Sequence, residues 1–227
     1  FIHEHLSAIY SISEDGIHYT KKVWKVSGEK LKLSRLGIEA QEPLPKRTDG
    51  VFTLVSCSNL IPVKRVHLIA EAVKKLDGQL PLRWVHIGDG PERAKIEQMV
   101  SDLSDQTEVR FIGRIANVEV FKLYRELCPD VFINVSSSEG VPVSIMEAMS
   151  FGIPVIATNV GGNGEIVNEK NGELLSAESG ATELTKAIQM FGKEEQEGKK
   201  IEAYITWKNN YSGKKNYTSF IQSLQSL

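Results

Sequence analysis

Residues 130–161 constrain the fold of this chain more than any other part of its sequence. The apolar run at 131–135 has the length and the β-branched residues of a β-strand. A helix is predicted to begin near Pro142, because a proline in the first turn has no N–H to leave unpaired. Gly152 then ends the helix, and residues 154–157 form a second strand. The pattern is typical of a strand–turn–helix–strand unit in a parallel sheet.

Two glutamates set the chemistry of this unit: Glu139 in the turn, and Glu147 about a turn and a half into the helix. Ligands of a parallel sheet bind beyond the carboxyl ends of its strands, where the N-terminus of a helix attracts phosphate. Carboxylates repel phosphate, but they accept hydrogen bonds from the hydroxyl groups of a sugar or a ribose. The combination favours a nucleotide-sugar site. The alternative is a capped helix with Glu147 in solvent.

Strands and helices alternate through most of the chain, which favours βαβ units. Further strands are predicted at residues 51–56, 83–87, 109–112 and 172–175, and helices at 64–76, 92–103, 118–127, 181–190, 194–209 and 212–227. Nearer the N-terminus, short strands at 8–12 and 30–34 flank a helix at 15–24, and residues 37–50 have the composition of a linker. We therefore expect an α/β fold, a Rossmann-like parallel sheet with helices on both faces and further helices at the C-terminus.

Composition excludes several classes of protein. A chain of 227 residues can bury one good core, and its net charge of −2 gives no basic surplus for nucleic acid. The sequence contains no run of about 18 apolar residues that would span a membrane. Cys57 and Cys128 adjoin apolar runs far apart, so we expect buried free thiols and a reducing cytoplasm. The His and Cys residues share no metal-ligand spacing, and no Asp-x-Asp pair occurs, which predicts a site without a metal or a cofactor.

Four motifs together resemble the family-four retaining glycosyltransferases, which have the two-domain GT-B fold. The main one is EGVPVSIMEAM at 139–149, in which two glutamates are separated by seven residues. The others are SNLIPVK at 58–64, VHIGDGP at 85–91 and TNVGGNGEIV at 158–167. The resemblance implies that residues 48–227 form the nucleotide-sugar donor-binding domain and that residues 1–47 are a remnant of the N-terminal acceptor domain plus a linker. Because the chain opens on Phe1, we expect a fragment that lacks most of that N-terminal domain.

The resemblance also implies roles for individual residues. Glu139 is expected to lie beside the transferred sugar and act in catalysis, Glu147 to hold the ribose diol, and Lys64 to bind the diphosphate with the helix dipole. The remaining donor-binding residues are expected at the helix start and at other strand ends: Gly140, Val141, Pro142, Val143, Gly88 and Arg114. The family usually has an arginine five residues before the lysine, but this chain has Asn59, so Arg65 or another residue would have to compensate.

The expected function is hexosyl transfer with retention of configuration, from a UDP- or GDP-sugar to a glycan or lipid-linked acceptor. We expect a cytoplasmic enzyme, with peripheral association of the full-length protein at the inner membrane face left open. The chain alone is expected to bind donor weakly and transfer nothing. One alternative is a non-catalytic nucleotide- or sugar-binding module on the same fold. Another is a dinucleotide-binding domain, which Gly88 and Gly90 suggest but Arg93, at the third glycine position, disfavours.

Overall fold

The computed structural model describes residues 5–45, 47–193 and 196–227. Its main body is built on a six-stranded sheet in the order β5-β4-β3-β6-β7-β8, and every neighbouring pair is parallel. The strands are β3 (Phe52–Cys57), β4 (Leu82–Ile87), β5 (Thr107–Gly113), β6 (Val131–Asn134), β7 (Val155–Thr158) and β8 (Gly172–Leu175). The strand order runs outward in opposite directions from β3 and β6. A parallel sheet binds its ligands at such a reversal, beyond the carboxyl ends of the strands.

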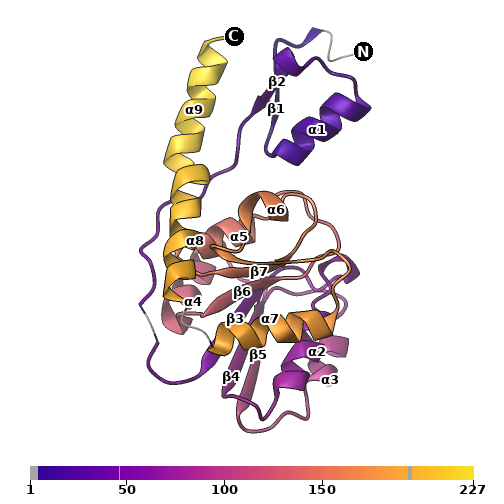
Figure 1. Ribbon diagram of the computed structural model, residues 1–227, viewed down its shortest axis with the longest axis vertical. Coiled ribbons are helices and arrows are strands. Elements are labelled where there is room, and N and C mark those ends of the chain that lie inside the picture. Colours follow the sequence, from indigo (N-terminus) through magenta and orange to yellow (C-terminus); the bar gives the residue numbers. More distant parts are fainter. Residues whose placement is uncertain (1–4, 46, 194–195) are drawn as a thin grey trace.

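Helices cover both faces of this sheet, as predicted (Figure 1). One face packs under α2 (His67–Leu76), α3 (Arg93–Met99) and α7 (Ala181–Lys193), and the fully buried Trp84 lies in that core. The other face packs under α4 (Asn117–Leu127), α5 (Val143–Ser150), the short α6 (Asn163–Ile166) and α8 (Glu197–Asn210). Strands buried on both sides require near-continuous apolar runs, which is why β6 and β7 show no alternation in the sequence.

The N-terminal residues form a small separate unit. In it, β1 (Ile9–Ser11) pairs in parallel with β2 (Leu31–Leu33), and α1 (Glu14–Val23) connects them by way of a short 3₁₀ turn, η2 (Gly28–Lys30). The C-terminal helix α9 (Gly213–Gln225) rises beside this unit (Figure 1). The Tyr10 and Phe220 rings meet edge to face, 4.9 Å between centroids, and the Tyr10 hydroxyl is 2.8 Å from Ser223 Oγ. The small unit and α9 are therefore held together by side-chain contacts.

A connecting segment of residues 34–51 leads from this unit into the main body. It passes very close to the start of α9: a Cβ on Gly37 would lie 2.5 Å from Gly213 Cα. The Ile38 N–H donates to the Tyr211 carbonyl at 2.8 Å. The predicted boundary between residues 47 and 48 falls within this segment. The division into an acceptor-domain remnant and a donor domain stays a prediction.

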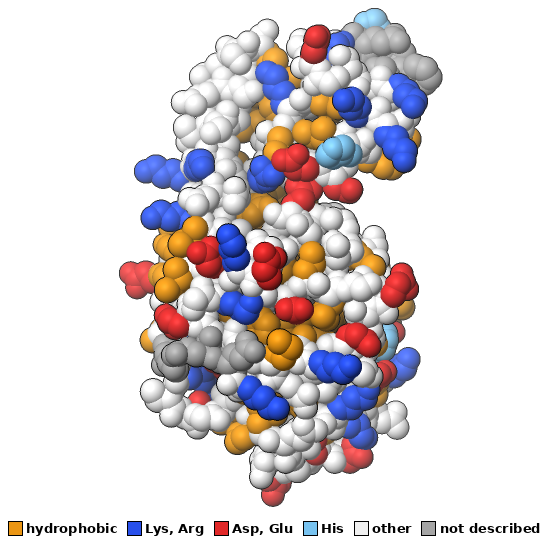
Figure 2. All heavy atoms as spheres, viewed as in Figure 1, with side chains coloured by type: hydrophobic (Ala, Val, Ile, Leu, Met, Phe, Trp, Pro, Cys, Tyr) orange, Lys and Arg blue, Asp and Glu red, His pale blue; other side chains and the backbone are white. Residues whose placement is uncertain are grey.

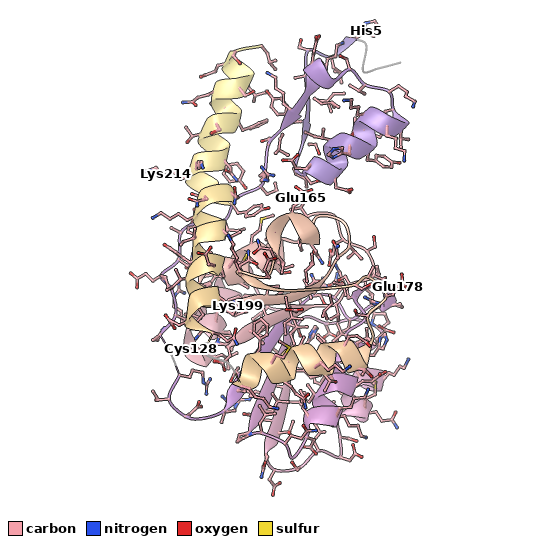
Figure 3. The ribbon with its side chains drawn as sticks, in the orientation of Figure 1. His5, Cys128, Glu165, Glu178, Lys199 and Lys214 are labelled. Carbon is pink, nitrogen blue, oxygen red and sulfur yellow. The ribbon has the colours of Figure 1, made fainter. Side chains whose placement is uncertain are left out.

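Glu165 on α6 joins the main body to the small unit. Its carboxylate oxygens accept the N–H groups of Glu14 and Asp15, both at 2.9 Å, at the positive N-terminal end of α1. Glu165 faces α1 in Figure 3, and Figure 2 shows acidic side chains gathered at this junction. Arg35 bridges Glu14 at 3.0 Å and lies 3.8 Å from Glu165, so it balances part of that negative charge.

Most predicted elements are present, and two boundaries need correction. The helix predicted at 64–76 begins at His67, because Lys64 belongs to a separate 3₁₀ turn, η3 (Pro62–Lys64), and Arg65 takes a left-handed backbone conformation with φ 47°. The helix predicted at 92–103 ends at Met99. The predicted helix start at Glu194 lies outside the described residues, and α8 begins at Glu197. Among the described helices, none combines the length and apolarity needed to cross a membrane.

Candidate functional site

A hollow of about 400 Å³ opens at the carboxyl ends of β3, β4, β5 and β6, next to the N-terminus of α5. It therefore lies at the reversal of strand order, where a parallel sheet offers its ligand site. Eight of the predicted site residues line it: Asn59, Lys64, Gly88, Arg114, Glu139, Val141, Pro142 and Val143. Gly140 and Glu147 are outside the set of lining residues. The fold thus gathers most of the predicted residues, while their roles stay predictions.

The turn before α5 is shaped by two glycines that follow β7. The Gly162 N–H donates to the Gly140 carbonyl at 2.8 Å. Gly161 has φ +49°, and a Cβ there would lie 1.8 Å from the Glu139 carbonyl oxygen. The structure shows a reason for this glycine pair: only glycine lets the chain after β7 pass so close to the turn that holds Glu139.

Three polar side chains hold the Glu139 carboxylate. Its Oε1 accepts from Lys64 Nζ at 2.7 Å, from Ser136 Oγ at 2.6 Å and from Asn134 Nδ2 at 3.1 Å. Burial by itself would raise the pKa of Glu139, but the hydrogen bonds from Lys64, Ser136 and Asn134 outweigh it, so the pKa is lowered. Among the described residues, no donor reaches the second oxygen, Oε2. An ionised carboxylate with one uncommitted oxygen therefore faces the hollow.

Lys64 is the cationic partner in this arrangement. It ends η3, which follows β3 after residues 58–61, and its ammonium group pairs with Glu139 while its side chain stays 23% exposed. An ammonium group has three N–H donors, so this pair leaves donors for a ligand anion. Arg65 does not add to this charge in the hollow. Its guanidinium turns to the main chain of β6 and donates to the Val135 carbonyl at 2.7 Å.

Glu147 has a different environment from Glu139. It is only 8% exposed, and Asn117 Nδ2, at the start of α4, donates to its Oε1 at 2.6 Å. Burial raises the pKa of Glu147, and the single amide hydrogen bond opposes this effect. Val143, one helical turn earlier on α5, lines the hollow. Glu147 therefore lies behind the wall of the hollow, so the alternative of a solvated Glu147 is wrong.

Cys57 lies at the end of β3 and also lines the hollow. Burial, followed by the charge of Glu147, raises the pKa of the Cys57 thiol to about 12, which leaves it protonated and unreactive at neutral pH. Cys57 and Cys128 are both free and half-buried. The expectation of free thiols is confirmed, with less burial than predicted. The described residues include no group of three or more His, Cys, Asp or Glu side chains that could hold a metal ion.

A buried polar chain supports the floor of the hollow. His86 Nε2 is 3.1 Å from the Ser58 carbonyl and therefore donates to it, which leaves Nδ1 to accept from Ser56 Oγ at 2.8 Å. Trp84 Nε1 donates to that Ser56 oxygen at 2.9 Å. Burial lowers the pKa of His86 to about 4, so the ring is neutral. A Cβ on Gly88 would lie 1.9 Å from the Ser58 carbonyl that His86 holds, so Gly88 marks a tight approach of β3 and β4.

Several side chains that organise the site were not predicted from the sequence. Asn134, Ser136 and Asn117 position the two carboxylates, and His86 was considered only as a metal ligand. Ser136 lies three residues before Glu139, a local signal that could have been used. Asn117 meets Glu147 across 30 positions of sequence, and only the fold shows this contact.

Comparisons with known proteins agree on one family. The family described as glycosyl transferases, group 1, is matched over residues 39–226. The chain is 26% identical over 192 residues to N-acetyl-alpha-D-glucosaminyl L-malate synthase of Bacillus anthracis, an alignment that covers 84% of this chain and 45% of that protein. It is 30% identical over 185 residues to the O-antigen biosynthesis glycosyltransferase WbnH of Escherichia coli, covering 75% of this chain and 51% of that protein. The chain thus spans about half the length of these curated relatives.

A solved structure gives the same fold. The Anabaena protein HepE in complex with UDP-glucose superimposes with a TM-score of 0.79 at 21% sequence identity, covering 97% of this chain and 64% of that chain. At this identity the likeness shows the fold alone. It includes the small N-terminal unit and α9, because nearly the whole chain is covered.

Proposed function

Since this chain belongs to the group 1 glycosyl transferases, we propose that its hollow binds a nucleotide-sugar donor and that the protein transfers the hexosyl group with retention of configuration. The acceptor is a glycan or a lipid-linked saccharide. One observation supports this proposal above the others: the Glu139 carboxylate is fixed through Oε1 while Oε2 remains uncommitted beside Lys64. A fixed anion beside a cation suits a ligand that has both hydroxyl groups and phosphates.

The diphosphate would bind between Lys64 and the N-terminus of α5. Pro142 precedes this helix, and no side chain caps it among the described residues. Val143 and Ser144, the first two residues of the helix, line the hollow, so their N–H groups are candidates for phosphate oxygens. The positive end of the helix and the ammonium group of Lys64 together replace the charge that a metal ion would supply. A donor site that needs no metal therefore stays our prediction.

The two carboxylates would then interact with different parts of the donor. Glu139, in the turn before α5, would lie beside the sugar, where its negative charge stabilises the positive charge that develops on the anomeric carbon. Glu147, further into the helix, would accept from the ribose diol through the oxygen that Asn117 does not occupy. This use of Glu147 requires the wall at Val143 to give way slightly, because Glu147 itself is buried.

Acceptor binding is proposed to need a further domain. The charged side chains that line the hollow are Lys64, Arg114 and Glu139, and all three are assigned here to the donor. Group transfer requires an acceptor held close to the anomeric carbon, and in two-domain enzymes this happens when the domains close. We therefore expect the 227-residue chain to bind donor without multiple turnover.

Calorimetric titration of the chain with UDP, UDP-glucose, GDP, NAD and free glucose tests the binding part of the proposal. The expected result is binding of one nucleoside diphosphate and its sugar derivative, without binding of NAD. Binding of free glucose alone would favour a sugar-binding module instead. Turnover is tested with radiolabelled nucleotide sugars and a panel of acceptors. Robust transfer by the chain alone would contradict the need for a further domain.

A further inference from the structure

We propose that the guanidinium of Arg114 binds the diphosphate of the donor. This inference rests on the proposed function and deepens it. The resemblance implies only that Arg114 binds the donor at a strand end, without naming the part of the donor. The side-chain geometry points to the phosphates.

The charge balance of the hollow is the first argument. Its charged lining residues are Lys64, Arg114 and Glu139. Lys64 and Glu139 form an ion pair at 2.7 Å, so each cancels much of the field of the other. Arg114 is in no salt bridge within the described part of the chain. It is therefore the main uncompensated positive charge in the hollow. The diphosphate has at least two negative charges, so it is the part of the donor that this positive charge would attract.

The direction of the Arg114 side chain is the second argument. Arg114 follows β5, and β4 lies between β5 and β3 in the sheet. Its Nη2 nevertheless lies 3.4 Å from Asn59 Oδ1, just beyond the end of β3. The side chain therefore extends back across the end of β4, where Gly88 has no side chain to obstruct it. The guanidinium thus extends from the end of β5 toward the segment that follows β3 and leads to Lys64.

The neighbours of Arg114 leave its guanidinium available. Asp89 is an acidic residue that the charge of Arg114 influences, but Asp89 already accepts from Arg93 at 3.2 Å and from the Gly90 N–H at 2.8 Å. The contact with Asn59 is long and involves a neutral acceptor. A guanidinium can bind two phosphate oxygens at once through its parallel N–H groups. Phosphate oxygens would therefore displace the Asn59 contact readily.

The test compares a nucleoside diphosphate with its nucleoside. We would measure the affinity of the chain for UDP or GDP, whichever the wild-type protein binds, and for the matching nucleoside, by calorimetry. Arg114→Gln should weaken diphosphate binding by about tenfold or more and change nucleoside binding by less than about twofold. Arg110→Gln is the matched control, because Arg110 is an exposed arginine on β5, the strand that Arg114 follows, and has Glu108 as its partner. It should leave both affinities unchanged.

A second variant tests whether the lost positive charge causes the weaker diphosphate binding of Arg114→Gln. Asn59→Arg introduces a guanidinium from the end of β3 into the same hollow, and in the Arg114→Gln background it should restore diphosphate affinity to within about threefold of wild type. Failure of this rescue would count against the proposal. Equal losses for nucleoside and diphosphate in Arg114→Gln would overturn it in favour of a contact with the base, and an unchanged diphosphate affinity would overturn it too. If the wild-type protein binds no nucleoside diphosphate, the proposed function itself is refuted, which is a separate and recognisable result.

Discussion

The turn before α5 and the interior of α5 each hold a glutamate, and the pKa values of the two are shifted in opposite directions. Glu139 in the turn meets three hydrogen-bond donors, one of them charged, and its pKa is lowered. Glu147 in the helix meets one amide donor, and burial raises its pKa. The Glu139 side chain is 9% exposed and Glu147 as a whole residue is 8% exposed, so both carboxylates are largely withdrawn from solvent. The number and the charge of the hydrogen-bond donors around each carboxylate therefore decide whether its pKa is lowered or raised.

The opposite pKa shifts suit the two roles proposed for these carboxylates. A carboxylate that must stabilise developing positive charge has to be ionised throughout, and the surroundings of Glu139 ensure that. A carboxylate that binds a ribose diol lacks part of its hydrogen bonding while no ligand is bound. Glu147, with its single donor, matches this description. The two regions can be separated by five substitution or pH experiments.

The largest effect is expected at Gly161, which supports the turn of Glu139 and does not touch Glu147. Gly161→Ala should lower the free energy of unfolding by roughly 3 kcal/mol or more, because the residue has φ +49° and its new Cβ would lie 1.8 Å from the Glu139 carbonyl oxygen. Gly140→Ala is the control, since a Cβ there meets nothing within 4 Å. Urea unfolding of both variants measures the difference. Equal stability of the two would show that the turn can move away freely.

Glu139→Gln comes next, and its effect on stability should have the opposite sign to that of Glu147→Gln. Removing the Glu139 charge leaves Lys64 without its partner and should cost about 2–3 kcal/mol at pH 7. Neutralising Glu147 removes a partly desolvated charge and should be neutral or stabilising by up to about 1 kcal/mol. Thermal unfolding at pH 7 measures both variants. Destabilisation of similar size in both would refute the electrostatic contrast.

Glu139→Gln should also reduce the preference for the sugar derivative over the free nucleoside diphosphate. The reason is that Glu139 is proposed to contact the sugar rather than the nucleotide. Titrations of the variant with UDP and UDP-glucose, or with the guanine pair if that binds, measure the ratio of the two affinities. A parallel loss for both ligands would show that the assignment of Glu139 to the sugar is wrong.

Glu147→Ala should weaken binding of the free nucleoside diphosphate by about 10- to 100-fold while the fold stays intact. A hydrogen bond between a hydroxyl group and a charged acceptor contributes ~1.5–3 kcal/mol, and the ribose diol would lose it. The 2′-deoxy form of the nucleotide is the matched control, because it should bind the wild-type protein more weakly and the variant with little further loss. An unchanged affinity in Glu147→Ala would rule out the ribose assignment.

The smallest effect is the pH dependence of stability that each carboxylate contributes. The lowered pKa of Glu139 adds stability above its unfolded value, and this is lost as the pH falls through the folded pKa. The raised pKa of Glu147 does the reverse, because stability falls as the pH rises from the unfolded value through the folded one. Relative to wild type, Glu139→Gln should lose most stability near neutral pH, and Glu147→Gln should gain most there. Urea unfolding between pH 4 and 7.5 measures both trends, and parallel curves would contradict them.

Sequence patterns alone determined the architecture of this protein. Alternating apolar runs and amphipathic stretches gave the parallel sheet with helices on both faces, because burial on two sides demands continuous apolar strands. The glutamate pair in the 130–161 unit located the site, because ligands of a parallel sheet bind at the strand ends. These features were readable since each depends on residues close together in the chain. The start of α2 was misjudged, because the left-handed backbone of Arg65 has no signal in the residue type.

Only the tertiary structure decided how the site residues are paired and charged. Lys64 and Glu139 are 75 positions apart in sequence, Asn117 and Glu147 are 30 apart, and Arg114 and Asn59 are 55 apart. Each pair joins different segments of the fold, so it exists only once the sheet order is fixed. Burial acts in the same way, because the environment that raises one carboxylate pKa and the donors that lower the other come from distant segments. A local motif can therefore place two glutamates at a site, but their protonation states follow from the packing around them.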